Sequence, residues 1–197
     1  TQRSRFVDPL APDSRLPEND HPVFTIRADL SEAGQCERVV ELTLARYGRI
    51  DLLVNAAVYW DRGMLLQNER VLRSAQAQFW LNTIVPVELS VLVAREHWSE
   101  DPDENRRKNR NIVNVSASSG LRVQPRLGES IYGATKAALN AFTGHLASEL
   151  EPLGVRVNAL APEPFSKRLK TDRVAAAIKE LDEGQASGKI AALSAKG

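Results

Sequence analysis

Three short apolar runs, separated by helix-forming sequence, constrain the fold of this chain more than any other feature. They cover residues 50–55, 112–115 and 154–160, and each is apolar over most of its length. A strand with one solvent-exposed face alternates apolar and polar residues, whereas a central strand of a parallel sheet is buried on both faces. The runs therefore predict a parallel sheet assembled from βα units.

Helical patterns and turn residues fill the intervals between these runs. Helices are predicted at residues 31–47, 69–98, 130–151 and 171–183, and further short strands at 23–26 and 188–193. Ser31 is expected to cap the first helix and Gly48 to end it, and Pro86 marks a kink or break in the second. The charged residues 99–110 are expected to be a solvated loop. This order predicts an α/β, Rossmann-like, doubly wound parallel sheet with helices on both faces.

Composition limits the class of protein. The 197 residues, 43% of them hydrophobic and 26% charged, predict a single globular domain over residues 1–197. A net charge of +1 gives no electrostatic case for binding nucleic acid or an anionic membrane. The only cysteine, Cys36, fits a reducing cytoplasm. No apolar stretch is expected to reach the ~20 residues that span a bilayer, and the three histidines lack metal-ligand spacing.

Tyr132 and Lys136 are the strongest candidates for chemistry. A spacing of four residues places both side chains on one face of a helix, one turn apart. A phenol has an ordinary pKa of about 10, and a nearby ammonium is expected to lower it toward useful acid/base chemistry. An isolated pair of this kind is more often an ordinary helix surface, so its neighbours decide the matter.

In this order, the elements resemble the short-chain dehydrogenase/reductase family over about residues 23–165. The resemblance rests on Asp29 and Leu30 in Ala-Asp-Leu-Ser, residues 51–57, Asn82 in Phe-Trp-Leu-Asn-Thr, residues 113–116, Tyr132 with Lys136, and residues 155–162. Each motif is weak alone, but together they follow the family's order on the expected elements.

The resemblance implies hydride transfer between a nicotinamide cofactor and a small carbonyl or alcohol. Tyr132 would be the general acid/base, Lys136 would lower its pKa and bind the nicotinamide ribose, and a serine would polarise the carbonyl. Asn82 would hold a water that links Lys136 to solvent. The cofactor-binding residues would be Arg3, Asp29, Leu30, Asn55, Ala56, Ala57, Tyr132, Lys136, Pro162 and Phe165.

The phosphate-binding end of the cofactor site departs from the family. The family holds the pyrophosphate at a glycine-rich turn, and this sequence contains no such turn. The chain is therefore expected to start after the family's first βα unit, which makes the fold N-terminally incomplete. Arg3 or Arg5 would then meet a 2′-phosphate and favour NADP(H), with NAD(H) as the alternative; a basic, frayed terminus explains them equally well.

Other departures surround the catalytic residues. Counting from Asn114 puts Ala117 at the family's serine position, so Ser116, Ser118 and Ser119 all remain candidates, with Ser118 favoured. Asn55-Ala56-Ala57-Val58 replaces Asn-Asn-Ala-Gly, which removes an amide and a glycine beside the cofactor, and Glu163 adds charge and bulk where the family has Pro-Gly. Residues 166–197 form a short tail unlike the family.

Two function classes follow from these observations. The favoured one is an NADP(H)-dependent reductase or dehydrogenase, and the alternative is a non-catalytic relative acting as a structural or regulatory subunit. In the family, the helices that hold Asn82 and Tyr132 commonly pack against their copies, and Ala138, Phe142 and Leu146 suit such packing. We therefore expect a homodimer or homotetramer.

Overall fold

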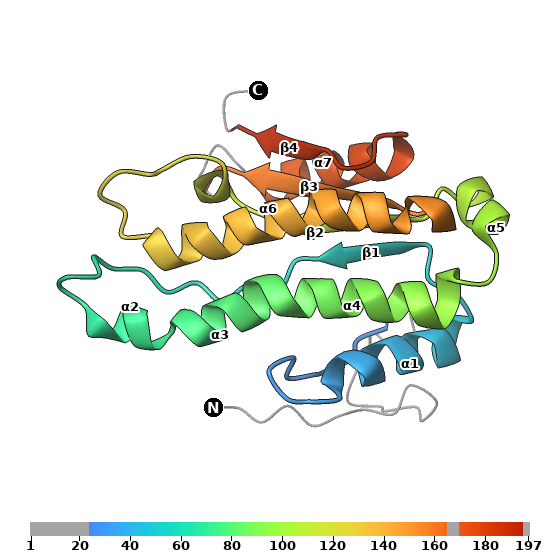
Figure 1. The fold of residues 1–197 in the computed structure, drawn as a ribbon, viewed down its shortest axis with the longest axis horizontal. Helices are drawn as coiled ribbons and strands as arrows, with labels where there is room; N and C mark the ends of the chain where they lie inside the picture. Colours follow the sequence, from blue (N-terminus) through green and yellow to red (C-terminus); the bar gives the residue numbers. More distant parts are fainter. Residues whose placement is uncertain (1–23, 165–169, 195–197) are drawn as a thin grey trace.

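The computed structural model describes residues 24–164 and 170–194 and contains one parallel sheet (Figure 1). Its strands are β1 (Leu52–Asn55), β2 (Asn111–Val115), β3 (Arg156–Pro162) and β4 (Ile190–Leu193), adjacent in that order. All three pairings are parallel, with Asn55 opposite Asn114 and Asn114 opposite Ala159. The parallel sheet predicted from the apolar runs is confirmed, and all four carboxyl ends lie at one edge.

Helices connect these strands and cover both faces of the sheet. They are α1 (Gln35–Tyr47), α2 (Glu69–Arg73), α3 (Ala75–Phe79), α4 (Val85–Val93), α5 (Pro102–Arg107), α6 (Ser130–Leu150) and α7 (Thr171–Glu183). The α4 and α6 helices lie side by side on one face, with α1 against α4, and α7 packs on β2 and β3 from the other face (Figure 1). The predicted doubly wound α/β class is confirmed.

Two apolar cores hold these layers together. The larger core joins α1, α4 and α6 to the sheet through residues such as Val40, Val93, Trp98, Ile112 and Leu150. The smaller core packs Val174 and Leu181 of α7 against Val113 and Leu160. Burial of this kind contributes about 25 cal/mol for each square ångström of apolar surface removed from water, so the helix layers depend on these contacts.

Three local predictions are wrong. Residues 24–29 form no strand, because no neighbouring strand pairs with them in the described structure, and Phe24 instead lies under the Arg46 guanidinium at 5.7 Å. The helix begins at Gln35 rather than after Ser31, whose backbone N–H and hydroxyl both donate to the Asp29 carboxylate in a turn. Residues 102–107, expected in a loop, form α5.

The α5 helix starts at a clear local signal. Asp101 is its N-cap and accepts a hydrogen bond from the backbone N–H of Glu104 at 2.8 Å, and Pro102 occupies the first turn. Both features favour a helix start, because the cap satisfies an otherwise unpaired N–H and proline lacks one. The many charged residues of this segment led to the prediction of a loop, although Asp101 and Pro102 are signals for the start of a helix.

The helix from Ala75 to Trp98 is continuous through two π-helical turns, η2 (Trp80–Ile84) and η3 (Ala94–Trp98). It is the one helix of the described part that is long and apolar enough to cross a membrane, which corrects the expectation that no apolar stretch approaches that length. Half of its apolar window is buried inside the protein, against α1 and α6. This burial is typical of a core helix, which explains the apolar composition. Pro86 follows the first π turn and does not end the helix.

Candidate active site

The carboxyl ends of β1 and β2 meet at a ladder of buried amides. The Asn55 Nδ2 donates to Asn114 Oδ1 at 2.8 Å, and Asn114 Nδ2 donates to the Thr143 hydroxyl at 3.0 Å. Asn55 Nδ2 also lies 3.3 Å from the Pro86 carbonyl. The predicted cofactor residue Asn55 is thus buried and turned inward, where it joins β1 to β2 and α4.

Lys136 and Tyr132 lie on the α6 helix beside the end of β2. Lys136 is only 2% exposed, and its Nζ donates to the Val115 carbonyl at 2.9 Å. The same Nζ lies 5.9 Å from the centre of the Tyr132 ring. The predicted juxtaposition of the two side chains is therefore present, with the ammonium held by the end of the neighbouring strand.

The pKa shifts differ from the expectation. Burial raises the pKa of Tyr132 to about 12, and the charge of Glu129 adds to this increase. Burial also lowers the pKa of Lys136 to about 8. The predicted lowering of the Tyr132 pKa is wrong, because burial disfavours the phenolate and the Glu129 carboxylate repels its charge. Tyr132 consequently keeps its hydroxyl proton at neutral pH.

Asn82 lies within the η2 π-helical turn and is fully buried. Its Oδ1 accepts from the Tyr59 N–H at 2.7 Å, and its Nδ2 donates to the Tyr59 carbonyl at 2.8 Å and to the Thr135 hydroxyl at 3.1 Å. Asn82 therefore connects the loop after β1 to α6, next to Lys136. Its side chain has this positioning role, and the proposed water-holding role stays a prediction.

The three candidate serines follow β2. The hydroxyl of Ser116 donates to the Lys136 backbone carbonyl at 3.2 Å, and the Ser118 hydroxyl accepts from Gln124 Nε2 at 3.5 Å. Ser118 and Ser119 begin the η4 turn (Ser118–Gly120), which packs on α6 so closely that a Cβ at Gly120 would lie 2.7 Å from the Lys136 carbonyl carbon. The serine turn is thus pressed against the helix that carries Tyr132 and Lys136.

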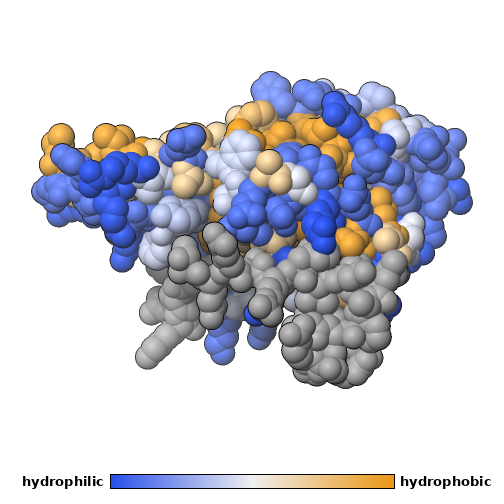
Figure 2. Space-filling model, turned by 90° about the horizontal axis from the view of Figure 1, so that it is seen from below, coloured by the Kyte–Doolittle hydropathy of each residue, from blue (hydrophilic) through white to orange (hydrophobic). Residues whose placement is uncertain are grey.

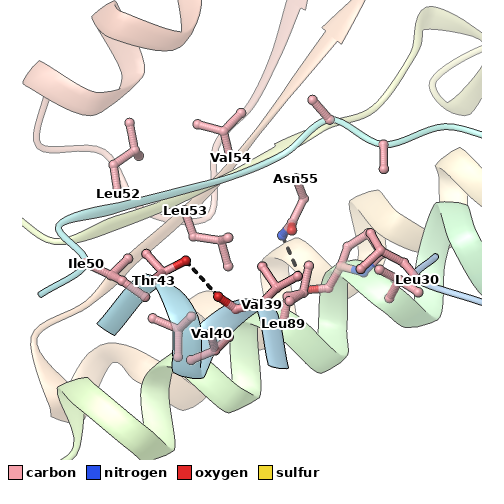
Figure 3. Close-up of a pocket in the computed structure, with 15 residues that line it drawn as sticks. Leu30, Val39, Val40, Thr43, Ile50, Leu52, Leu53, Val54, Asn55 and Leu89 are labelled. Carbon is pink, nitrogen blue, oxygen red and sulfur yellow. Dashed lines mark hydrogen bonds between the residues drawn. The ribbon is translucent and has the colours of Figure 1, made fainter. Parts of the chain in front are cut away.

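A groove runs along the open edge of β1, between α1 and α4 (Figure 3). It has a volume of about 260 Å³ and is lined mainly by apolar side chains, among them Leu30, Val39, Leu53 and Leu89. Ala56 and Ala57, both exposed, extend the lining beyond Asn55. In the described part of the chain β1 pairs only with β2, so the backbone of its other edge faces this groove. The predicted residues Leu30, Asn55, Ala56 and Ala57 are therefore brought together here.

The remaining predicted cofactor residues are less closely grouped. The Asp29 carboxylate accepts two hydrogen bonds from Ser31, which lower its pKa. Pro162 ends β3 beside Leu193, at the same edge of the sheet as Tyr132. Arg3 and Phe165 lie outside the described residues. Glu163 forms an ion pair with Arg122 at 3.0 Å, so its charge is opposed by a residue from the loop after the serines.

Trp60 and Arg122 are two further neighbours of the site: the position of Trp60 close after Asn55 made it a candidate pocket residue, whereas nothing in the sequence indicated Arg122. The Trp60 indole lies edge-on to the Tyr132 ring, with 6.5 Å between the ring centres, and Arg122 bonds Glu163. Nothing in the spacing of Arg122 and Glu163, which are far apart in the sequence, indicates their contact.

Comparison with known proteins agrees with this geometry. The family model described as short chain dehydrogenase matches residues 8–180. The chain belongs to this family. A relative, 1,6-dihydroxycyclohexa-2,4-diene-1-carboxylate dehydrogenase of Pseudomonas putida, is 32% identical over 144 residues, which cover 71% of this chain and 48% of the relative. The chain spans about half the length of the first curated relatives that it matches.

Solved structures of short-chain dehydrogenases have the same fold. A Brucella ovis member of the family in complex with a partially ordered NAD is 26% identical, with a TM-score of 0.68 over 85% of this chain and 77% of that one. RhlG of Pseudomonas aeruginosa in an NADP active-site complex is 20% identical, with a TM-score of 0.76 over 87% of this chain and 75% of that one. The first likeness supports the family and the second supports the fold alone.

Proposed function

We propose that this short-chain dehydrogenase chain carries the catalytic half of an oxidoreductase that interconverts a small carbonyl compound and an alcohol. The observation that supports this most is the pair of half-buried Tyr132 and buried Lys136 at the carboxyl edge of a parallel sheet. Ligands of open α/β sheets bind at that edge. Solved relatives hold NAD or NADP, so a nicotinamide cofactor is the group expected here.

The residues present fit the nicotinamide end of such a cofactor. Tyr132, Lys136 and Pro162 lie at one edge of the sheet, and the exposed Ala56 and Ala57 continue β1 without bulky side chains. The sequence has no glycine-rich phosphate turn, so a cradle for the pyrophosphate is not supplied by these 197 residues. We propose NADP(H) over NAD(H) because Arg3 and Arg5 match the segment after the family's second strand.

The cofactor supplies or accepts the hydride, and the chain's own residues handle the proton. With its raised pKa, Tyr132 holds its hydroxyl proton across the neutral range and donates it to the carbonyl oxygen during reduction. The Ser118 hydroxyl, oriented by Gln124, donates a hydrogen bond to the same oxygen. The Lys136 ammonium opposes the charge left on the phenolate, which is worth most where water is excluded.

Substitution of Tyr132 tests the proposed chemistry. The chain should be joined to a glycine-rich βα unit from a relative and assayed with NADPH and NADH against a panel of carbonyl compounds. Tyr132→Phe keeps the ring and removes the proton, so turnover should fall by about 10²–10⁴-fold while the fold and cofactor binding persist. Equal turnover by the variant would show that Tyr132 is not the donor. Absence of turnover with all carbonyls would favour the non-catalytic alternative.

A further inference from the structure

Trp60 forms an aromatic wall beside the reactive phenol. Its indole meets the Tyr132 ring edge-on, with a 68° angle between the ring planes, yet 53% of the residue is exposed. A tryptophan this exposed leaves a large apolar surface in water, next to the group that the proposed reaction uses. We propose that Trp60 selects substrates whose carbonyl carbon carries an aromatic or otherwise apolar substituent, with that substituent packed on the indole.

The Trp60 side chain is held in place by the protein itself, without a bound substrate. The Asn82 side chain holds both backbone groups of Tyr59, one residue before Trp60. The Arg62 guanidinium stacks over the indole at 4.8 Å from the ring centre. Stacking of this kind is favourable because the ring face carries negative partial charge. Contacts of Tyr59, before Trp60, and of Arg62, after it, therefore hold the indole. A side chain that is already held loses less conformational entropy when a ligand binds.

A second loop reinforces this arrangement from across the site. The Gly63 N–H donates to the Gly128 carbonyl at 2.8 Å, which joins the loop after β1 to the loop before α6. Gly128 has a φ of +65°, and a Cβ there would lie 2.6 Å from the Gly63 carbonyl carbon. A glycine is therefore required at position 128, and the loop carrying Trp60 is held against the loop that leads to Tyr132.

The surroundings of the wall are also apolar. Both joined loops expose large hydrophobic side chains: Val58, Tyr59, Met64, Leu65, Leu121, Val123 and Leu127. Figure 2 shows some apolar residues, beside hydrophilic ones, at the end of the molecule where Figure 1 places the loop before α2. The nearby carboxylates of Asp61 and Glu163 are paired with arginines. An apolar substituent packed on the indole would remove part of this apolar surface from water.

This inference rests on the proposed function, because it assigns Trp60 to the substrate that Tyr132 would protonate. Binding can nevertheless be measured without turnover. Acetophenone and hydroxyacetone are the probes, because both are small ketones and differ in the apolarity of the larger substituent. Their affinities should be measured by ligand-observed NMR titration of the unaltered chain, Trp60→Ala, Trp60→Phe and Trp80→Phe. Trp80 is the matched control, since it is 41% exposed on the η2 turn.

We expect Trp60→Ala to weaken acetophenone binding about tenfold, and Trp60→Phe and Trp80→Phe to leave it near the original value. Hydroxyacetone should bind all four proteins alike. Acetophenone should also quench the fluorescence of the unaltered chain saturably, a signal that Trp60→Phe removes and Trp80→Phe keeps, whether or not Trp60→Ala folds. Non-saturable quenching would overturn the role of Trp60, and so would a loss of the quenching signal in Trp80→Phe as large as the loss in Trp60→Phe. Saturable binding at Trp60 without turnover of any carbonyl would instead overturn the proposed reaction.

Discussion

Asn82 pairs with the backbone of Tyr59 through both ends of its amide, as a neighbouring strand would. The Oδ1 accepts at 2.7 Å and the Nδ2 donates at 2.8 Å, and the residue is completely buried. The side chain comes from a π-helical turn, a geometry that often marks functional sites. Through this contact the core helix fixes the loop that passes the candidate active site.

Replacement of Asn82 should therefore loosen the site. Asn82→Ala removes the hydrogen-bond partner of the Tyr59 N–H and carbonyl, and each lost hydrogen bond of this kind costs about 0.5–1.5 kcal/mol. We expect a lower free energy of unfolding in urea and a red-shifted Trp60 emission. Gln78→Met is the matched control: Gln78 is also buried on this helix but donates within it, to Ser74. An unchanged emission spectrum in Asn82→Ala would contradict the anchoring role.

The serine variants separate a catalytic role from a structural one. The test protein is the chain joined to a glycine-rich βα unit from a relative, here called the chimera. In it, Ser118→Ala should lower kcat by about 10²–10³-fold, as loss of an oxyanion donor does, with little change in stability. Ser116→Ala removes a hydrogen bond to the Lys136 carbonyl and should mainly destabilise the fold, by about 1 kcal/mol. If Ser118→Ala keeps full activity, the polarising role passes to Ser116 or Ser119.

Lys136 should make the stability of the chain depend on pH. Its pKa falls from the ordinary 10.5 to about 8 on burial, so between these values the unfolded chain binds the proton more tightly than the folded one. The free energy of unfolding must then rise from pH 8 to pH 10.5, by on the order of 3 kcal/mol from this group alone. Urea unfolding of the unaltered chain and Lys136→Met at both pH values measures the difference. An equal pH dependence in the two proteins would show that burial does not shift this lysine.

The elements that depend on local pattern were predictable from the sequence. The strands β1, β2 and β3 are buried on both faces and therefore show as apolar runs, and α7 was predicted with its observed bounds because its apolar residues recur at helical spacing. Gly48 ends α1 in the left-handed conformation, as expected of a C-terminal glycine. The pairing of Tyr132 with Lys136 follows from helix geometry alone.

The features that depend on distant contacts could not be predicted. Residues 24–26 have a strand-like composition, but a strand exists only beside a partner, and this is a property of the whole fold. The Tyr132 pKa is set by the burial that tertiary packing produces. Leu146, expected on an interface, is 5% exposed and belongs to the larger core, whereas Phe142, one turn earlier, is 38% exposed. Helix spacing does not tell which apolar stripe faces inward.

The exposure of Phe142, in contrast to the burial of Leu146, allows a test of how copies of the chain assemble. Phe142 on α6 and Ile84 on the neighbouring η2 turn are both exposed, on helices that contact each other. If this face joins two copies of the chain, Phe142→Glu with Ile84→Glu should convert a dimer or tetramer to a monomer in sedimentation at micromolar concentration. Leu66→Glu is the control, since Leu66 is fully exposed on the loop before α2. A monomeric unaltered chain, or an oligomer that tolerates both charges, would contradict the proposed interface.

Cofactor affinity should depend on a unit that this sequence does not contain. Without a glycine-rich turn, several charge-assisted hydrogen bonds to the pyrophosphate are missing, each worth about 1.5–3 kcal/mol. Calorimetric titration should therefore show weak or no NADPH binding by the 197-residue chain and tight binding by the chimera. The added strand is expected to pair with the open edge of β1 and fill its apolar groove, so Val39→Asp should weaken NADPH binding by the chimera. Leu66→Asp, at a fully exposed position on the loop before α2, should not. Tight NADPH binding by the 197-residue chain would refute this account of the cofactor site.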